Sequence, residues 1–276
     1  MKYPRILLAL GAVTIALAGG AWVFLFRAEA PTTEVALPPP VVYVPPKSNV
    51  VTPPPAAPVP PRPNRATSTA VQVASSTEAF SASLRLDVPF LSQAPKKDWA
   101  MPYQEACEEA SVLMVQAYFA GKRTNFLPEE GDQAILSIVD WAAEQYGSEL
   151  VDMTAAEVAT MVEGYMPGLK ATVKPLKTAN DIKRELAKGF PVILPADGKR
   201  LENPRFRNGG PRYHMLVIKG YLDDGRWITN DPGTQFGENF LYAQQNLLDS
   251  ARDWNGGDVP NGASVMLVLE PAPAKR

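Results

Sequence analysis

The sequence contains one thiol and one imidazole, and these two side chains can act together in catalysis. The 276 residues include one cysteine, Cys107, and one histidine, His214. A thiolate attacks carbonyl carbon, and a neighbouring imidazole takes the thiol proton and returns it to the leaving amine. One cysteine cannot form an internal disulfide, and one cysteine with one histidine is a poor ligand supply for a zinc site. The pair therefore predicts covalent thiol chemistry, with no metal and no cofactor.

The helix expected around Cys107 predicts an activated thiol. Apolar residues at helical spacing predict a helix over residues 104–120, ended by Gly121. Cys107 then lies in the first turn and faces inward. Backbone N–H groups and the helix dipole favour a thiolate at this position, so they lower the thiol pKa.

His214 and Asp231 are expected on two successive strands. Residues 213–221 and 226–230 form these strands, and the Asp-Gly pair between them is a strong hairpin signal. Asp231 follows the second strand and supplies a carboxylate that can fix the imidazole tautomer. With a two-residue turn, Asp231 faces residue 218 rather than His214. Contact therefore requires a bulge, a longer turn or a diagonal approach.

Each of these three residues also has an ordinary structural interpretation. A lone buried cysteine is usually a small inert hydrophobe, a lone histidine is usually a satisfied core or surface residue, and Asp-Pro-Gly is first of all a turn. Their joint order favours the functional interpretation. Cysteine on an early helix, followed by histidine and a carboxylate on later strands, is the order used by papain-like cysteine peptidases.

Four segments carry a resemblance to a known family. They are residues 88–95 (Val-Pro-Phe-Leu-Ser-Gln-Ala-Pro), 103–111, 213–221 and 230–233. Together they resemble the papain-like domains of the double-glycine leader peptidases of bacteriocin exporters, over roughly residues 84–270.

The resemblance implies a papain-like cysteine peptidase fold and a peptide or protein substrate. It implies Cys107 as nucleophile, His214 as general base and then acid, and Asp231 as the residue that orients the imidazole. In such sites a glutamine side chain and a backbone N–H hold the oxyanion. Of two upstream glutamines, Gln93 at the end of the Val-Pro-Phe-Leu-Ser-Gln motif is preferred over Gln104, which lies at the helix start.

Glu108 departs from the pattern of that family, which typically has glycine after the cysteine. A carboxylate that points inward would raise the pKa of the Cys107 thiol. At a helix N-terminus the side chain can instead point to solvent. The departure bears on full peptidase activity more than on the fold.

The rest of the domain predicts an α+β class. Helices are expected over residues 132–146, 154–165 and 178–188, the second opened by a Thr154/Glu157 capping box. Strands are expected over residues 84–90, 190–194 and 263–270, with residues 239–254 forming a strand and then a helix. Helices come first and strands cluster late, which favours α+β over a wound parallel sheet.

The residues before the domain predict that the domain is exported from the cytoplasm and that a spacer joins it to a membrane anchor. Residues 1–5 are expected in the cytoplasm, residues 6–26 as a transmembrane signal-anchor helix, residues 27–82 as a proline-rich and then Ser/Thr/Ala-rich linker, and residues 83–276 as the domain. The uncharged run over residues 6–26 is long enough to span a bilayer. Lys2 and Arg5 before it favour a domain outside the cytoplasm. Cleavage near Ala18, which would release a secreted protein, is the alternative.

These observations predict a membrane-anchored, extracytoplasmic cysteine peptidase that hydrolyses amide bonds through a thioester. Lys and Arg total 27 against 29 Asp and Glu, without a dense basic run, so no nucleic-acid partner is expected. Three alternatives stay open. They are an inactive papain-like module that binds peptides, an amidase or transglutaminase-like enzyme with the same triad, and a purely structural spacer attached to the envelope.

Overall fold

The computed structural model describes residues 35–44, 79–147 and 152–273. Residues 37–276 belong to one unit of the chain, and its described part contains every helix and strand discussed below. The predicted membrane span over residues 6–26 and the cleavage site near Ala18 lie outside the described residues. Within them, no helix has the length and apolar character needed to cross a bilayer.

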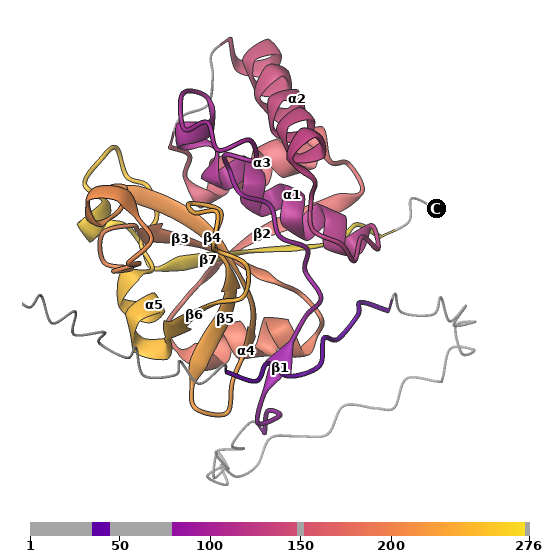
Figure 1. Ribbon diagram of the computed structural model, residues 1–276, viewed down its shortest axis with the longest axis vertical. Helices are drawn as coiled ribbons and strands as arrows, with labels where there is room; N and C mark the ends of the chain where they lie inside the picture. Colours follow the sequence, from indigo (N-terminus) through magenta and orange to yellow (C-terminus); the bar gives the residue numbers. More distant parts are fainter. Residues whose placement is uncertain (1–34, 45–78, 148–151, 274–276) are drawn as a thin grey trace, which may run out of the picture. The chain divides into compact units, whose positions relative to one another are not determined.

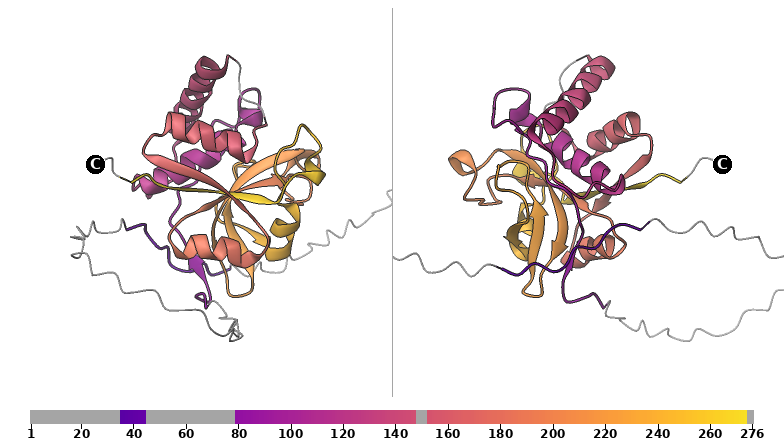
Figure 2. Two further views of the ribbon diagram at one scale, coloured as in Figure 1. Left: turned by 180° about the vertical axis from the view of Figure 1, so that it is seen from behind. Right: turned by 45° about the vertical axis from the view of Figure 1, so that its right-hand side comes forward.

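The three longest helices of the described residues lie together on one side of the sheet (Figure 1). They are α1 (Cys107–Phe119), α2 (Pro128–Tyr146) and α3 (Ala155–Tyr165), and a 3-10 turn, η1 (Tyr103–Glu105), precedes α1. Two shorter helices, α4 (Ala179–Ala187) and α5 (Gln244–Ser250), lie apart from them (Figure 2). The predicted capping box opens α3, because Thr154 Oγ1 accepts the Glu157 N–H and the Glu157 carboxylate accepts the Thr154 N–H.

Antiparallel pairing joins the strands of the described residues into one sheet. Its order is β2-β7-β3-β4-β5-β6, and β1 pairs with β4 off this path. The strands are β1 (Leu84–Arg85), β2 (Leu169–Pro175), β3 (Val192–Asp197), β4 (Tyr213–Tyr221), β5 (Arg226–Asn230), β6 (Phe240–Ala243) and β7 (Val265–Pro271). Helices beside an antiparallel sheet confirm the predicted α+β class.

One strand prediction was wrong, and one strand was not predicted. The strand expected over residues 84–90 is limited to Leu84–Arg85, followed by an isolated bridge at Leu86. No strand was expected over Leu169–Pro175, yet this segment pairs along its whole length with β7. Its alternation of lysine with smaller or apolar residues is the pattern of a half-exposed strand and was a usable signal.

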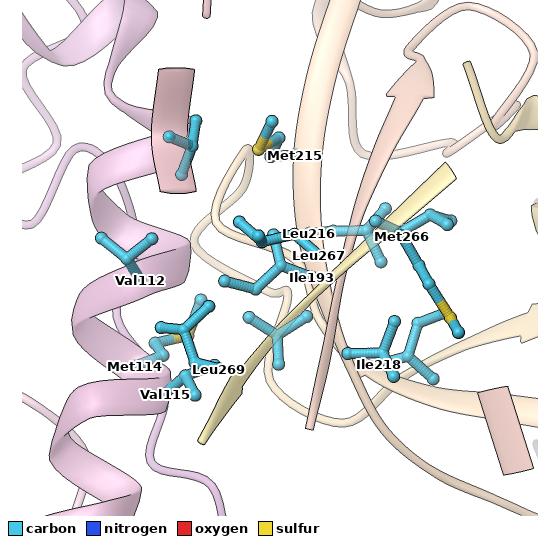
Figure 3. Close-up of a cluster of buried hydrophobic side chains, with 14 of the residues drawn as sticks. Val112, Met114, Val115, Ile193, Met215, Leu216, Ile218, Met266, Leu267 and Leu269 are labelled. Atoms are coloured by element: carbon cyan, nitrogen blue, oxygen red, sulfur yellow. The ribbon is translucent and has the colours of Figure 1, made fainter. Parts of the chain in front are cut away.

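Helix α1 is the central helix of the core. Its side chains Met114 and Val115 point towards the sheet, where Leu269 lies beside them (Figure 3). Because β4 covers one side of α1 and α2 packs on another, nearly the whole helix is buried rather than the single apolar face that its spacing predicted. Even the first turn, which carries Cys107, is enclosed by protein.

A short part of the predicted linker contacts the domain. Val41 forms a parallel bridge with Leu86, donating its N–H to the Arg85 carbonyl at 2.6 Å and accepting the Asp87 N–H at 3.1 Å. The Tyr43 ring packs edge-on against Phe119 of α1, with the ring centroids 4.9 Å apart. These contacts attach residues 37–44 beside β1, so this part of the chain is docked rather than a free spacer.

Candidate active site

The Cys107 side chain lies at the junction between α1 and β4. It is the first residue of α1 and is 5% exposed. Its sulfur accepts the backbone N–H of Met215, the residue after His214, at 3.3 Å. The N-terminus of the helix and the histidine strand therefore meet at the thiol.

His214 and Asp231 form a buried pair. His214 Nε2 lies 2.8 Å from Asp231 Oδ1, and the two side chains are 1% and 0% exposed. This contact uses Nε2, so Nδ1 is the ring nitrogen left for a proton on sulfur. The residue that was expected to orient the imidazole is therefore in hydrogen-bonding contact with it.

The Asp231 carboxylate is held by four donors. Besides His214, Tyr242 donates to Oδ2 at 2.6 Å, Asn203 Nδ2 donates to Oδ2 at 3.0 Å, and the Gly233 N–H donates to Oδ1 at 3.0 Å. Burial alone would raise the pKa of Asp231, but His214 and the hydrogen bonds from Tyr242 and the Gly233 N–H together hold it below its ordinary value. The carboxylate is thus kept ionised beside the imidazole.

Two features of the hairpin between β4 and β5 bring Asp231 within reach of His214. The turn contains three residues, Asp223, Asp224 and Gly225, because Leu222 pairs with Arg226. A bulge between Ile218 and Gly220 then shifts the register once more, so that Val217 faces Asn230. Extending that register places Asp231 opposite Leu216, and a diagonal contact on the same face reaches His214.

Phe206 and Gly233 close the other side of the imidazole. The Phe206 ring meets the His214 ring edge-on, with the centroids 5.2 Å apart. A Cβ atom at Gly233 would come within 2.8 Å of His214 Cε1 and 2.9 Å of the Phe206 ring, so only glycine leaves room there. The Asp-Pro-Gly segment is therefore a turn fitted against the histidine, rather than a turn alone.

The thiol is not hydrogen-bonded to the imidazole. Among the described residues, no hydrogen bond joins Cys107 to His214, and the thiol donates instead to Glu108 Oε2 at 2.8 Å. Burial, followed by the charge of Glu108, raises the pKa of the Cys107 thiol well above its ordinary value. The helix N-terminus was expected to lower this pKa, and burial with a neighbouring carboxylate outweighs it.

Of the two candidate glutamines, Gln93 lies beside the start of α1. Its Nε2 donates to the carbonyls of Tyr103 and Gln104, both at 2.9 Å, and its backbone N–H donates to the Pro232 carbonyl at 3.0 Å. Gln93 therefore links the turn before Cys107 to the segment after Asp231. The Gln104 side chain is exposed and donates to Glu105.

Asn203 and Tyr242 are the site residues that sequence reasoning missed. Asn203 lies in the loop between β3 and β4, and Tyr242 lies on β6, which was expected as a strand without a role in the site. Neither residue stands in a motif, so only the fold reveals that Asn203 Nδ2 bonds both the Tyr242 hydroxyl and Asp231. Within the described residues, no three His, Cys, Asp or Glu side chains gather as a metal site.

Replacing Tyr242 with phenylalanine should destabilise the domain by about 1.5–3 kcal/mol, the usual contribution of a hydrogen bond to a charged group. Because the pKa of Asp231 is lowered in the fold, its stabilisation is present above the ordinary aspartate pKa and is lost as pH falls. Loss of one donor raises that pKa towards its unfolded value, so Tyr242→Phe should lose less further stability on acidification than the natural chain does.

Urea unfolding across an acid pH series measures both effects. Tyr118→Phe is a matched control, since the Tyr118 hydroxyl is buried and has no hydrogen-bond partner among the described residues. Equal unfolding midpoints for the two variants would show that the Tyr242 hydroxyl does not stabilise Asp231.

Comparisons with known proteins found a family model and solved structures to which the chain is similar. A family model described as "Peptidase_C39 like family" matches residues 85–255. A solved structure described as a C39-like peptidase from Bacillus anthracis is 14% identical, with a TM-score of 0.43, over 70% of this chain and 97% of its own. Active interpain A, a cysteine protease from Prevotella intermedia, is 16% identical, with a TM-score of 0.39, over 68% and 95%. No curated protein matches the chain.

Proposed function

This chain belongs to the Peptidase_C39-like family of cysteine peptidases, and we propose that Cys107, His214 and Asp231 are the residues with which it hydrolyses peptide bonds. The observation that carries the proposal is the buried His214–Asp231 pair, because the backbone N–H of Met215, the residue after His214 on β4, contacts the Cys107 sulfur. A histidine with a purely structural role does not require a carboxylate that four donors hold in place. His214 also lies on the strand that contacts the single thiol of the chain.

The proposed reaction proceeds through a thioester. His214 Nδ1 takes the thiol proton, and the Cys107 sulfur attacks the carbonyl carbon of the scissile amide. The imidazolium, stabilised by Asp231, then gives its proton to the leaving amine. Water hydrolyses the thioester with His214 again serving as base, which restores the thiol.

Gln93 is the proposed side-chain donor to the oxyanion, together with a backbone N–H at Cys107. Its amide is buried beside the turn that begins α1, which supports this role over one for Gln104. Both Nε2 hydrogens are engaged by carbonyls of η1 in the resting site. Its buried Oε1 has no hydrogen-bond partner among the residues that the structure describes, so only the Nε2 end of the amide is held.

We propose that the substrate is a peptide or protein outside the cytoplasm and that the domain is anchored to a membrane. The support comes from the sequence: the uncharged run over residues 6–26 follows Lys2 and Arg5. The proline-rich residues beyond it suit a spacer between the membrane and the domain.

The test of the proposed function is a thiol-directed peptide electrophile applied to the full chain. Cys107 should react faster in the native protein than in the denatured protein, because only the folded site offers an imidazole as base. Cys107→Ala should abolish both labelling and hydrolysis of a peptide library. Labelling at the denatured rate, without hydrolysis, would instead favour an inactive peptide-binding module.

A further inference from the structure

Glu108 is a buried carboxylate placed directly against the nucleophile. It is 1% exposed, and its Oε2 accepts the Cys107 thiol at 2.8 Å. Its Oε1 accepts the backbone N–H of Met153 at 3.0 Å, and the Met153 carbonyl in turn accepts the Tyr213 hydroxyl at 2.9 Å. The carboxylate is therefore fixed between α1, the segment before α3 and β4.

No cation balances this carboxylate. Among the described residues, none forms an ion pair with Glu108. The titratable and charged groups that act on it and on its neighbours are Cys107 and Glu109 of α1, Asp152 before α3 and Tyr213 of β4, and through these neighbours Glu105, Arg212 and Asp253. Most of the nearby groups are acids, so the ionised form of Glu108 is disfavoured at this place.

We propose that Glu108 is a positioning residue that keeps Cys107 protonated and turned away from His214 in the resting site, and that releases the thiol when its carboxyl group takes up a proton. The proposal rests on the proposed function, because it assigns a control to the same nucleophile.

The two protonation states of Glu108 act on the sulfur in opposite directions. The ionised carboxylate accepts the S–H hydrogen bond, so the proton stays on sulfur. The neutral carboxyl group instead donates its O–H to a thiolate, while the thiol proton moves to His214 Nδ1. No other reactant is needed: one proton from solvent binds Glu108, and one proton passes from sulfur to nitrogen.

The direction of the pH dependence follows from proton counting. The thiolate–imidazolium pair carries the same number of protons as the thiol–imidazole pair, so pH selects between them through Glu108. Burial raises the pKa of Glu108 to about 7. The reactive pair should therefore become more populated as pH falls through that value, which is the opposite of an ordinary thiol.

The experiment measures the single thiol without any substrate. In the full natural chain, the rate of Cys107 alkylation by iodoacetamide should increase as pH falls from about 8 to about 6, across the Glu108 pKa. Glu108→Gln, whose amide always donates to sulfur, should react about tenfold faster at about pH 8, the effect of one pKa unit. In this variant, the alkylation rate should not increase as pH falls through the Glu108 pKa.

Glu109→Gln is the matched control, because Glu109 is equally buried but makes no hydrogen bond to the sulfur. In the Glu109→Gln protein, the alkylation rate should still increase as pH falls from about 8 to about 6, an effect called the inverse pH step. A natural chain whose alkylation rate only rises with pH would overturn the proposal, whether or not the variants fold. So would a folded Glu108→Gln protein that reacts at the natural rate at about pH 8.

The readout separates this proposal from the proposed function. An inverse pH step without peptide hydrolysis would support the role of Glu108 and contradict the peptidase. Peptide hydrolysis that depends on Cys107 and His214, with no response to Glu108→Gln, would support the peptidase and overturn the role of Glu108.

Discussion

Replacing His214 with alanine should lower peptide hydrolysis by about 10²- to 10⁴-fold, the usual contribution of a general acid–base group. The loss is expected to be near the upper end, since His214 is the only imidazole in the chain and, in the proposed mechanism, serves both the attack and the departure of the amine. The thiol also loses its proton acceptor, so its alkylation rate should rise only as pH approaches the high pKa of the buried Cys107. Steady-state kinetics and alkylation rates across pH measure these effects.

The protein should still fold without this imidazole. Asp231 retains donors from Tyr242, Asn203 and the Gly233 N–H. His214→Gln is the informative companion, because its amide can fill the space and donate to Asp231 but cannot carry a proton between sulfur and amine. If His214→Gln kept the natural rate of hydrolysis, His214 would be a packing residue and the proposed mechanism would be wrong.

Local patterns predicted the two strands that carry the site, but not how they meet. The bounds of β4 and β5 agree with the ranges predicted on either side of the Asp-Gly turn. The contact between His214 and Asp231 depends on the three-residue turn and on the bulge at Lys219, each of which shifts the register by one. The bulge coincides with β1 docking on β4, where the Leu86 N–H bonds the Lys219 carbonyl, so it depends on chain far away in sequence.

The orientation of Glu108 is also a tertiary effect. The helix dipole favours carboxylates in a first turn, and it says nothing about whether they meet solvent. Met153, 45 residues later, supplies the backbone N–H that draws Glu108 inward. The same packing buries Cys107 and reverses the pKa shift that its helix position predicted.

Replacing Gly237 with alanine should destabilise the domain by about 1–3 kcal/mol or more, the usual cost of overpacking a filled site. A Cβ atom at this position would overlap the backbone carbonyl of Asp231, and backbone cannot yield as a flexible side chain does. The Gly237 carbonyl also accepts the Asp231 N–H at 2.9 Å, so relief of the overlap must break or lengthen that bond. Gly168→Ala is the control, because nothing lies within 4 Å of a Cβ atom there.

Hydrolysis should suffer more than stability in the Gly237→Ala protein. Movement of the Asp231 backbone displaces its carboxylate from His214 Nε2, and catalysis depends on that alignment more steeply than folding does. Urea unfolding therefore needs to be paired with kinetics at a temperature where the variant is fully folded. A folded Gly237→Ala protein with natural kcat would show that the position of Asp231 does not limit the reaction. A fall in kcat that Gly168→Ala does not share would tie the rate to the packing of Gly237 against the Asp231 backbone.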